Sequence, residues 1–359
     1  MKIRRSLLSA LIGTVLLFGI TNCSSGSEGP TGGETIAQTP SNLVVSTLIK
    51  GSNAQNPYGD GSGVVDFSVK ADNATTYKML VNGETLTSST GTFSYTFKAL
   101  GVQEYTVYIS AYKGEKFISK TLNIKVNVQA KLVWSDEFST EGAPDPSKWT
   151  HEIGTGQDGW GNNELQYYTN RLQNSQVSDG TLKIRLIKEA FSGSTFTSSR
   201  LVTKNKYQFK YGKIEFRAKL PTGGGTWPAL WMLGSNIDQV GWPACGEIDV
   251  MEHVGNQQNQ VFSTLHYPGN FGGNAVGGKT TLATASTQFH VYAAEWSPSH
   301  IKFYIDDTLY FTFNNSQSLP FNQDFFIIMN MAMGGNFGGT IDPLVTNATL
   351  EVDYVRVYQ

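Results

Sequence analysis

The 359-residue sequence has few charged residues and only two cysteines. Charged side chains make up 16% of the chain and the formal net charge is −2, which argues against binding to nucleic acid or to an anionic membrane surface. Helical periodicity is almost absent. The longest apolar run, from Leu7 to Ile20, is too short for a comfortable membrane span. These absences disfavour a nucleic-acid-binding protein, a helical protein and a membrane-spanning chain.

Glycine, aromatic residues and short alternating runs are abundant instead. The chain has 38 glycines and 12% aromatic residues, as expected of an all-β protein with many turns and an aromatic-lined cleft. At 359 residues the chain exceeds one ordinary domain, and we expect two.

The N-terminus has the layout of an export signal, a basic start followed by an apolar run that ends at Cys23. It resembles a bacterial lipoprotein signal. We therefore expect residues 1–22 to be removed and Cys23 to be lipidated, which would anchor the exported protein at the bacterial outer membrane or cell surface. Asn22 departs from the small residue typical before such a cysteine, so a plain signal peptide is the alternative. With Cys23 lipidated, Cys245 is a free thiol, and we expect it to be a buried packing residue.

Residues 23–40 are rich in Ser, Gly, Thr and Pro and predict a flexible linker. Residues 41–128 predict a separate β-sandwich of about seven strands that is immunoglobulin-like and resembles PKD-like modules. Its alternating runs are 64–69, 77–81, 92–97 and 104–109, and Asn82-Gly83 is a hairpin signal between the second and the third of these runs. Exposed aromatics such as Tyr95, Tyr108 or Tyr112 would suit a carbohydrate-binding module. No planar aromatic row is evident, so the sequence favours a spacer.

Residues 131–359 predict one long all-β domain. Alternating runs recur at 181–186, 213–218, 291–296, 301–305, 309–313 and 350–358. We expect two antiparallel sheets packed as a β-jelly roll, with a concave face that forms a cleft.

One segment of this domain, residues 246–255 (GEIDVMEHVG), carries three carboxylates among apolar strand residues. Strand alternation puts Glu247 and Asp249 on one face, and a one-residue β-bulge near Met251 would return Glu252 to that face. Three acids on one face repel one another, which is a poor arrangement for stability alone. A pair of carboxyls, one ionised and one protonated, is the equipment of a retaining glycosidase. A metal site is the rival, but metal-binding acids usually come from turning loops.

The sequence Glu-Ile-Asp-Val-Met-Glu resembles the bulged signature of glycoside hydrolase family 16. Five further blocks in the same order resemble its laminarinase-like members: 132–138, 159–168, 211–234, 264–269 and 351–358, with 242–255 around the signature itself. The resemblance implies that Glu247 is the nucleophile, Glu252 the acid and base, and Asp249 the residue that tunes Glu247. It also implies a jelly-roll fold.

Sugar rings present apolar C–H faces, so a glucan cleft needs flat aromatic side chains together with hydrogen-bonding groups. The resemblance and this chemistry together suggest eight substrate-binding candidates. Trp231 is as likely to belong to the core, and the two Asn-loop candidates also fit simple turn chemistry. We read His253 as a core histidine. The candidates are Trp227, Trp231, Trp242, Trp296, Asn162, Glu164, Arg200 and His266.

The resemblance further implies a structural Ca²⁺ away from catalysis, held by Glu137, the carbonyl of Gly180 and Asp353. Ordinary surface charges are the alternative reading of the two acids. No cofactor is expected for catalysis itself.

The sequence therefore predicts a monomeric, retaining endo-β-glucanase. Its expected substrate is β-1,3-glucan (laminarin) or mixed-linkage β-1,3-1,4-glucan, and the near-neutral charge suits such a neutral polysaccharide. The alternatives are an agarase- or carrageenase-like galactanase, a transglycosylase and a non-catalytic surface glycan-binding protein. The last would require a lost catalytic acid, and all three acids are present.

Overall fold

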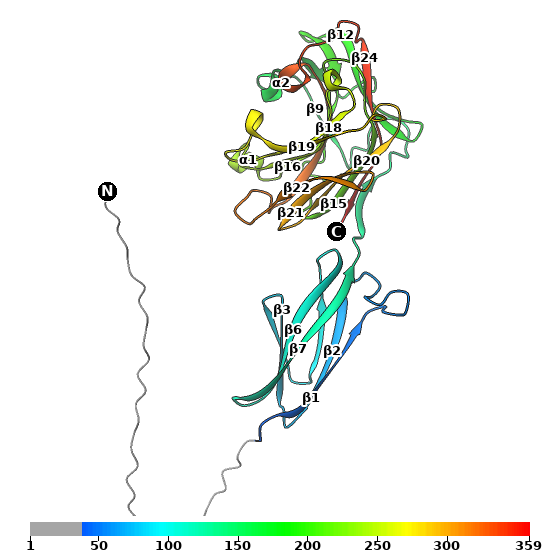
Figure 1. Cartoon of the computed structure of the whole chain (residues 1–359). Coiled ribbons are helices and arrows are strands. Elements are labelled where there is room, and N and C mark those ends of the chain that lie inside the picture. The colour runs from blue at the N-terminus through cyan, green and yellow to red at the C-terminus, as the bar shows by residue number, and fades with distance from the viewer. Residues whose placement is uncertain (1–37) are drawn as a thin grey trace, which may run out of the picture. The chain divides into compact units, whose positions relative to one another are not determined.

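The computed structural model describes residues 38–359, and strands dominate it (Figure 1). The predicted signal peptide, Cys23 and nearly all of the predicted linker lie outside the described residues, so the lipid anchor stays a prediction. No helix in the described part of the chain has the length and apolar character needed to cross a membrane.

Residues 41–128 form two sheets, one of three strands and one of four. The strands are β1 (Ser41–Ile49), β2 (Val64–Asp72), β3 (Thr76–Val81), β4 (Glu84–Ser88), β5 (Thr92–Thr96), β6 (Gly101–Lys113) and β7 (Lys116–Val128). Their orders are β1-β2-β5 and β4-β3-β6-β7. The Asn82-Gly83 turn joins β3 to β4, a short strand that the sequence did not single out. The seven strands match the predicted number.

The chain divides into two compact units, within each of which the residues lie closer to one another than to the rest of the chain. The smaller includes Asp66–Ser94 and Tyr105–Ile124, and the larger includes Leu48–Val65, Tyr95–Glu104 and Lys125–Gln359. The sheets divide the chain more simply, because no sheet takes strands from both residues 41–128 and residues 132–358. The domain boundaries expected from the sequence stay a prediction.

Residues 132–358 form a sheet of ten strands and a sheet of seven. The ten-stranded sheet contains β8 (Leu132–Asp136), β10 (Gln166–Tyr168), β11 (Ser175–Ser178), β12 (Thr181–Phe191), β13 (Ser194–Ser198), β15 (Gly212–Lys219), β20 (His290–Trp296), β21 (His300–Ile305), β22 (Thr308–Asn314) and β24 (Asn347–Tyr358). The seven-stranded sheet has the order β19 (Val276–Thr281), β18 (Gln260–His266), β17 (Glu247–Glu252), β16 (Thr226–Gly234), β23 (Phe325–Met333), β14 (Arg200–Val202) and β9 (Thr150–Glu152). Short helical turns join them: η1 (Gly159–Asn163), α1 (Ile237–Val240), η2 (Gly255–Gln257), η3 (Gly272–Asn274) and α2 (Gly335–Gly338).

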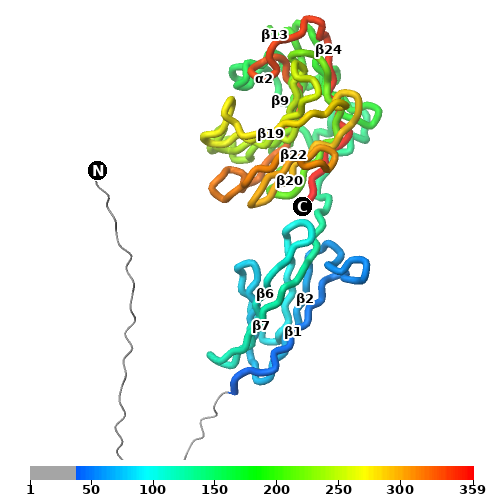
Figure 2. The backbone as a smooth tube through the Cα atoms, in the orientation of Figure 1, coloured from blue at the N-terminus to red at the C-terminus, as the bar shows by residue number. Residues whose placement is uncertain are grey.

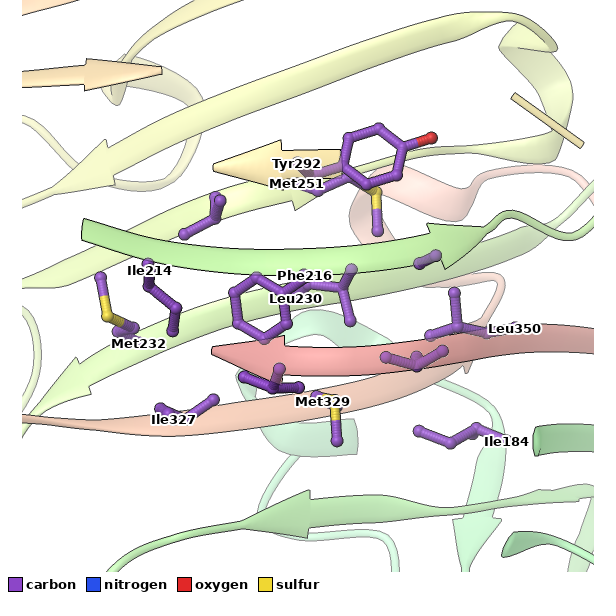
Figure 3. Packing of buried hydrophobic residues seen from close by; sticks show 14 of the residues in the cluster. Ile184, Ile214, Phe216, Leu230, Met232, Met251, Tyr292, Ile327, Met329 and Leu350 are labelled. Atoms are coloured by element: carbon purple, nitrogen blue, oxygen red, sulfur yellow. The ribbon is translucent and has the colours of Figure 1, made fainter. Parts of the chain in front are cut away.

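The two sheets bury one hydrophobic core between them, as the predicted jelly roll requires (Figure 3). Ile214 and Phe216 of β15 belong to the ten-stranded sheet, whereas Leu230 and Met232 of β16 belong to the seven-stranded sheet. Each such buried side chain stabilises the fold by about 1.5–3 kcal/mol. Because strand residues alternate, the residues between these core positions point to the other face of each sheet. That outer face of the seven-stranded sheet carries the site described next.

Candidate active site

The three acids lie on β17, in the middle of the seven-stranded sheet. Asp249 pairs with Trp231 of β16 and Met251 pairs with Leu230, so Val250 is an extra residue in β17. Val250 and Met251 both enter the core cluster, and Glu252 then returns to the outer face. The bulge predicted near Met251 is confirmed, and it is what gathers the acids on one face.

Glu247 is contacted by two donors from neighbouring segments. The Trp242 Nε1–H donates to Glu247 Oε2 over 2.9 Å, and His266 Nε2 lies 3.7 Å from Glu247 Oε1. Burial and the neighbouring Asp249 carboxyl raise the pKa of Glu247 to about 8, although His266 and Trp242 act in the opposite direction. Trp242 comes from the turn before β17, so the local chain supplies the first partner of this carboxyl.

His266 presents its Nε2 atom to the acids. The backbone N–H of Gly272 donates to His266 Nδ1 over 3.2 Å, so the neutral imidazole carries its proton on Nε2. That Nε2–H faces Asp249 Oδ2 at 3.3 Å as well as Glu247. The predicted position of His266 on a strand beside the acids is confirmed, because it pairs with Glu247 across β17 and β18. Its Nε2 lies nearer to Asp249 than to Glu247.

Asp249 is the most buried of the three acids, with 3% of its surface exposed. Its Oδ2 makes no hydrogen bond of good geometry despite the approach of His266. Burial, and then the charge of Glu252, raise the pKa of Asp249 well above its ordinary value. Asp249 is therefore held toward its protonated form and can share a proton with Glu247.

Glu252 is held by two donors on adjacent strands. The Trp227 Nε1–H donates to Oε1 over 3.1 Å, and the Thr264 hydroxyl donates to Oε2 over 2.6 Å. Burial raises the pKa of Glu252, and these two hydrogen bonds partly offset the rise. A threonine hydroxyl also accepts, so the Thr264 contact persists when Glu252 is protonated. Sequence reasoning missed Thr264, although its place two residues before His266 on one strand puts both side chains on the same face.

Further along the same sheet face, Arg200 is held between two indole rings. Its guanidinium carbon lies 4.5 Å from the centroid of the Trp160 ring and 4.8 Å from that of Trp231. Its Nε–H donates to Glu152 over 2.5 Å, on the strand that pairs with β14. Arg200 thus has a fixed position and a compensated charge.

A polar network continues from this point to the loop that contains η1. The Trp231 Nε1–H donates to Asn330 Oδ1 over 2.8 Å, and Asn330 Nδ2 donates to the Tyr168 hydroxyl over 3.0 Å. Tyr168 donates to Glu164 Oε2, which also accepts from Gln166, while Asn162 donates to Glu164 Oε1 over 3.3 Å. The network links the expected positions Asn162 and Glu164 to Trp231, which pairs with Asp249. Sequence reasoning missed its other members, Gln166, Tyr168 and Asn330.

The four tryptophan candidates have different surroundings. Trp242 is 46% exposed and packs on Phe271 with ring centroids 5.4 Å apart, so it presents ring surface to solvent. Trp227 is part-buried beside Glu252, and Trp231 is buried beneath Arg200. Trp296 is 2% exposed, lies in the core and donates its Nε1–H to the carbonyl of Phe321. The prediction that Trp296 contacts substrate is therefore wrong, because its strand position points between the sheets.

Two further sequence predictions concern buried residues. Cys245 is fully buried, and burial raises the pKa of its thiol to about 11, which suits a packing residue. His253 is also fully buried and bonds the carbonyl of Gln260 through Nδ1 at 2.8 Å, as predicted for a core histidine.

Two groups of side chains could bind a metal ion, one among the acids of β17 and one at the predicted Ca²⁺ site. Glu247, Asp249 and His266 each offer a ligand atom, and these atoms lie within 4.8 Å of one another. Glu247 Oε2 already accepts from the Trp242 indole and His266 Nδ1 from the Gly272 backbone, which favours proton chemistry over a cation there. At the predicted Ca²⁺ site, Glu137 is paired with Arg356 and Asp353 with Arg217. The Ca²⁺ site stays a prediction.

A jelly roll that carries paired carboxyls on one sheet face, with indole and hydroxyl donors fixed on them, defines a glycoside hydrolase. Residues 162–356 match the model of the glycosyl hydrolases family 16. The chain belongs to this family, as its bulged signature predicted.

Relatives and solved structures agree on the same region. A curated beta-glucanase of Rhodothermus marinus is 46% identical over 245 residues, which cover 64% of this chain and 85% of the relative. The X-ray structure of the laminarinase from Rhodothermus marinus gives a TM-score of 0.62 at 45% identity and covers 64% of this chain and 98% of the other. A LamA variant from Z. galactanivorans, in complex with laminaritriose and laminaritetraose, gives a TM-score of 0.59 at 45% identity and covers 64% of this chain and 99% of the other.

Proposed function

We propose that the protein is a retaining endo-β-1,3-glucanase in which Glu247 is the nucleophile, Glu252 the acid and base, and Asp249 the residue that tunes Glu247. The observation that carries the proposal is the bulge at Val250, since it places three carboxyls on one strand face and leaves fixed donors on both glutamates. Carboxyls this crowded cannot all ionise near neutral pH, so the group holds both a proton donor and a nucleophile.

The reaction would proceed in two displacements. Glu247 attacks the anomeric carbon while Glu252 gives its proton to the leaving glycosidic oxygen, which forms a glycosyl–enzyme ester. Glu252 then removes a proton from water, and that water displaces Glu247 with net retention. Asp249 shares its proton with Glu247, which spreads the negative charge of the departing carboxylate.

A neutral glucan suits the surroundings of the acids. Indole rings at Trp227 and Trp242 offer flat apolar surfaces, and Arg200 is already paired with Glu152 and so is not a free cation for a sulfate group. Two of the relatives are named glucan endo-1,3-beta-glucosidases, and one of them, from Cryptopygus antarcticus, is 38% identical, whereas a relative at 33% identity is a keratan-sulfate endo-1,4-beta-galactosidase of Sphingobacterium multivorum.

The test uses laminarin, barley mixed-linkage glucan and agarose with the parent protein and Glu247→Ser. We expect the parent to cut laminarin into a ladder of oligosaccharides, with the β-anomer formed first in NMR spectra. We expect Glu247→Ser to lose hydrolysis by at least about a thousandfold while it still binds oligosaccharide. Substantial turnover by that variant would refute the assignment, and cleavage of agarose in place of laminarin would point to a galactanase. Products longer than the substrate would identify a transglycosylase.

We also propose export and lipid anchoring at Cys23, supported by the basic start and apolar run of residues 1–22. The parent should sediment with membranes and Cys23→Ser should not. Membrane association that survives the substitution would rule out this anchor.

A further inference from the structure

The four-stranded sheet of residues 41–128 has one face turned toward the module's core and one turned outward. On β6, Val107, Ile109 and Ala111 are fully buried, so the alternate side chains Tyr108, Ser110 and Tyr112 point outward. Figure 1 and Figure 2 show β6 and β7 as long neighbouring strands of this sheet. We call its outward-pointing surface the module's outer face.

Three aromatic side chains of the consecutive strands β6 and β7 lie on this face. Tyr108 is 50% exposed and Phe117 is 55% exposed. The Phe117 ring packs beside Tyr112 with centroids 5.3 Å apart and an interplanar angle of 31°. Along β6, Tyr108 and Tyr112 are separated by about 13 Å, which is longer than one pyranose ring. Leu80 pairs with Tyr108 on the neighbouring strand and widens the apolar surface.

Small polar side chains surround these rings. Thr85 pairs with Leu80, and Thr87 pairs with Lys78, whose ammonium lies 5.0 Å from the centroid of the Tyr112 ring. The Thr106 hydroxyl of β6 donates to Asn123 Oδ1 of β7 over 3.0 Å. An antiparallel register that pairs Thr106 with Asn123 also pairs Tyr112 with Phe117, in agreement with their ring contact. That register puts Thr121 opposite Tyr108. The face therefore combines exposed rings with hydroxyls and an amide, and its one carboxylate on β6, Glu104, lies four residues before Tyr108, toward the start of the strand.

We propose that the module's outer face is a second binding site for a neutral polysaccharide, and that its occupant is the β-glucan that the catalytic domain cuts. Pyranose C–H faces stack on aromatic rings, and their hydroxyls bond threonine and asparagine side chains. A hydrophobic protein partner would instead be expected to meet a continuous apolar core. The identity of the glucan rests on the proposed function, but the site does not. The spacer interpretation favoured by the sequence is revised, because Phe117 completes a cluster that Tyr108 and Tyr112 alone do not make.

The aromatic residues allow the two sites to be measured separately. All seven tryptophans lie at or beyond Trp134, so tryptophan fluorescence reports the catalytic domain and not the module. The full chain carrying Glu247→Ser is used, so that bound glucan is not cut. Binding to insoluble β-1,3-glucan particles is measured by co-sedimentation, and laminarin oligosaccharides are titrated by tryptophan fluorescence.

We expect Tyr108→Ala with Phe117→Ala to lower the affinity for the particles about tenfold and to leave the fluorescence titration unchanged. In the active enzyme the same pair should lower turnover of particles and leave kcat/KM on short oligosaccharides unchanged. Tyr58→Ala is the matched control, because Tyr58 is an exposed aromatic residue of the same module outside this sheet. Melting temperatures of all variants establish that the module remains folded.

Unchanged particle binding by the folded double variant would overturn the proposal and restore the spacer. The proposal would also be overturned, in favour of self-association, by a different result: the parent is a dimer in sedimentation, and the double variant is a monomer that binds glucan as the parent does. If the parent fails to cut laminarin, the proposed function is refuted but the binding site on the outer face is not. The particle assay repeated with barley glucan, cellulose and agarose would then still test the outer face. Equal loss of particle binding by Tyr58→Ala would also count against the site.

Discussion

Replacing the proposed nucleophile should make the protein more stable. Burial and Asp249 raise the pKa of Glu247 from 4.5 to about 8, so the folded protein binds this proton more tightly than the unfolded chain. Stability then falls as pH rises between those two values, because the unfolded chain releases its proton first. Glu247→Gln removes the ionising group and keeps an oxygen that accepts from the Trp242 indole.

The size of the gain follows from the pKa difference. At pH 7 the group is 2.5 units above its unfolded pKa of 4.5, and at 1.36 kcal/mol per unit the upper limit is about 3.4 kcal/mol. The side chain is 16% exposed and contacts two donors, so we expect about 2 kcal/mol, or a rise in Tm of about 4–8 °C.

The assay is thermal unfolding of parent and Glu247→Gln from pH 5 to pH 9, followed by circular dichroism. The difference in Tm should be small at pH 5, grow toward pH 8 and then level off. Glu141→Gln, an exposed control in the same domain, should change Tm by less than about 1 °C. A Glu247→Gln variant that melts at or below the parent at pH 8 would refute the reasoning, since it would mean that the ionised carboxyl is well stabilised.

Three further predictions test individual contacts. His266 lowers the pKa of Glu247, so His266→Gln should move the acid limb of the kcat/KM profile to higher pH, and an unmoved limb would contradict its placement. The Thr264 hydrogen bond lowers the pKa of Glu252, so Thr264→Val should cut kcat about tenfold and move the basic limb upward, while Thr264→Ser should restore both. Trp296→Ala should cost about 3–5 kcal/mol in urea unfolding, whereas the exposed Trp242→Ala should cost under about 1 kcal/mol; similar costs would contradict the assignment of Trp296 to the core.

Much of the fold could be predicted because strand alternation is local. The runs at 213–218 and 350–358 became β15 and β24, and both bury alternate residues in the core. The short β4 was missed because the Asn82-Gly83 turn was expected to join the run 77–81 to the run 92–97, whereas it joins β3 to β4. Trp296 was misjudged for a different reason. Alternation on β20 already put Trp296 in phase with Tyr292 and Ala294 and out of phase with Glu295, but the prediction weighed its aromatic type instead of this phase.

The sequence by itself determined the acid strand, since the phase of Glu247, Asp249 and Glu252 around a bulge depends on neighbours within six residues. Only the tertiary structure decided which donors meet those acids. Thr264 and His266 reach them through the register of β18, and Trp227 reaches Glu252 from β16. Register between strands is set by side-chain packing across whole sheets, which no single segment encodes. On the module's outer face, the long-range pairing of β3 with β6 brings Leu80 opposite Tyr108, whereas Phe117 and Tyr112 meet across a single hairpin.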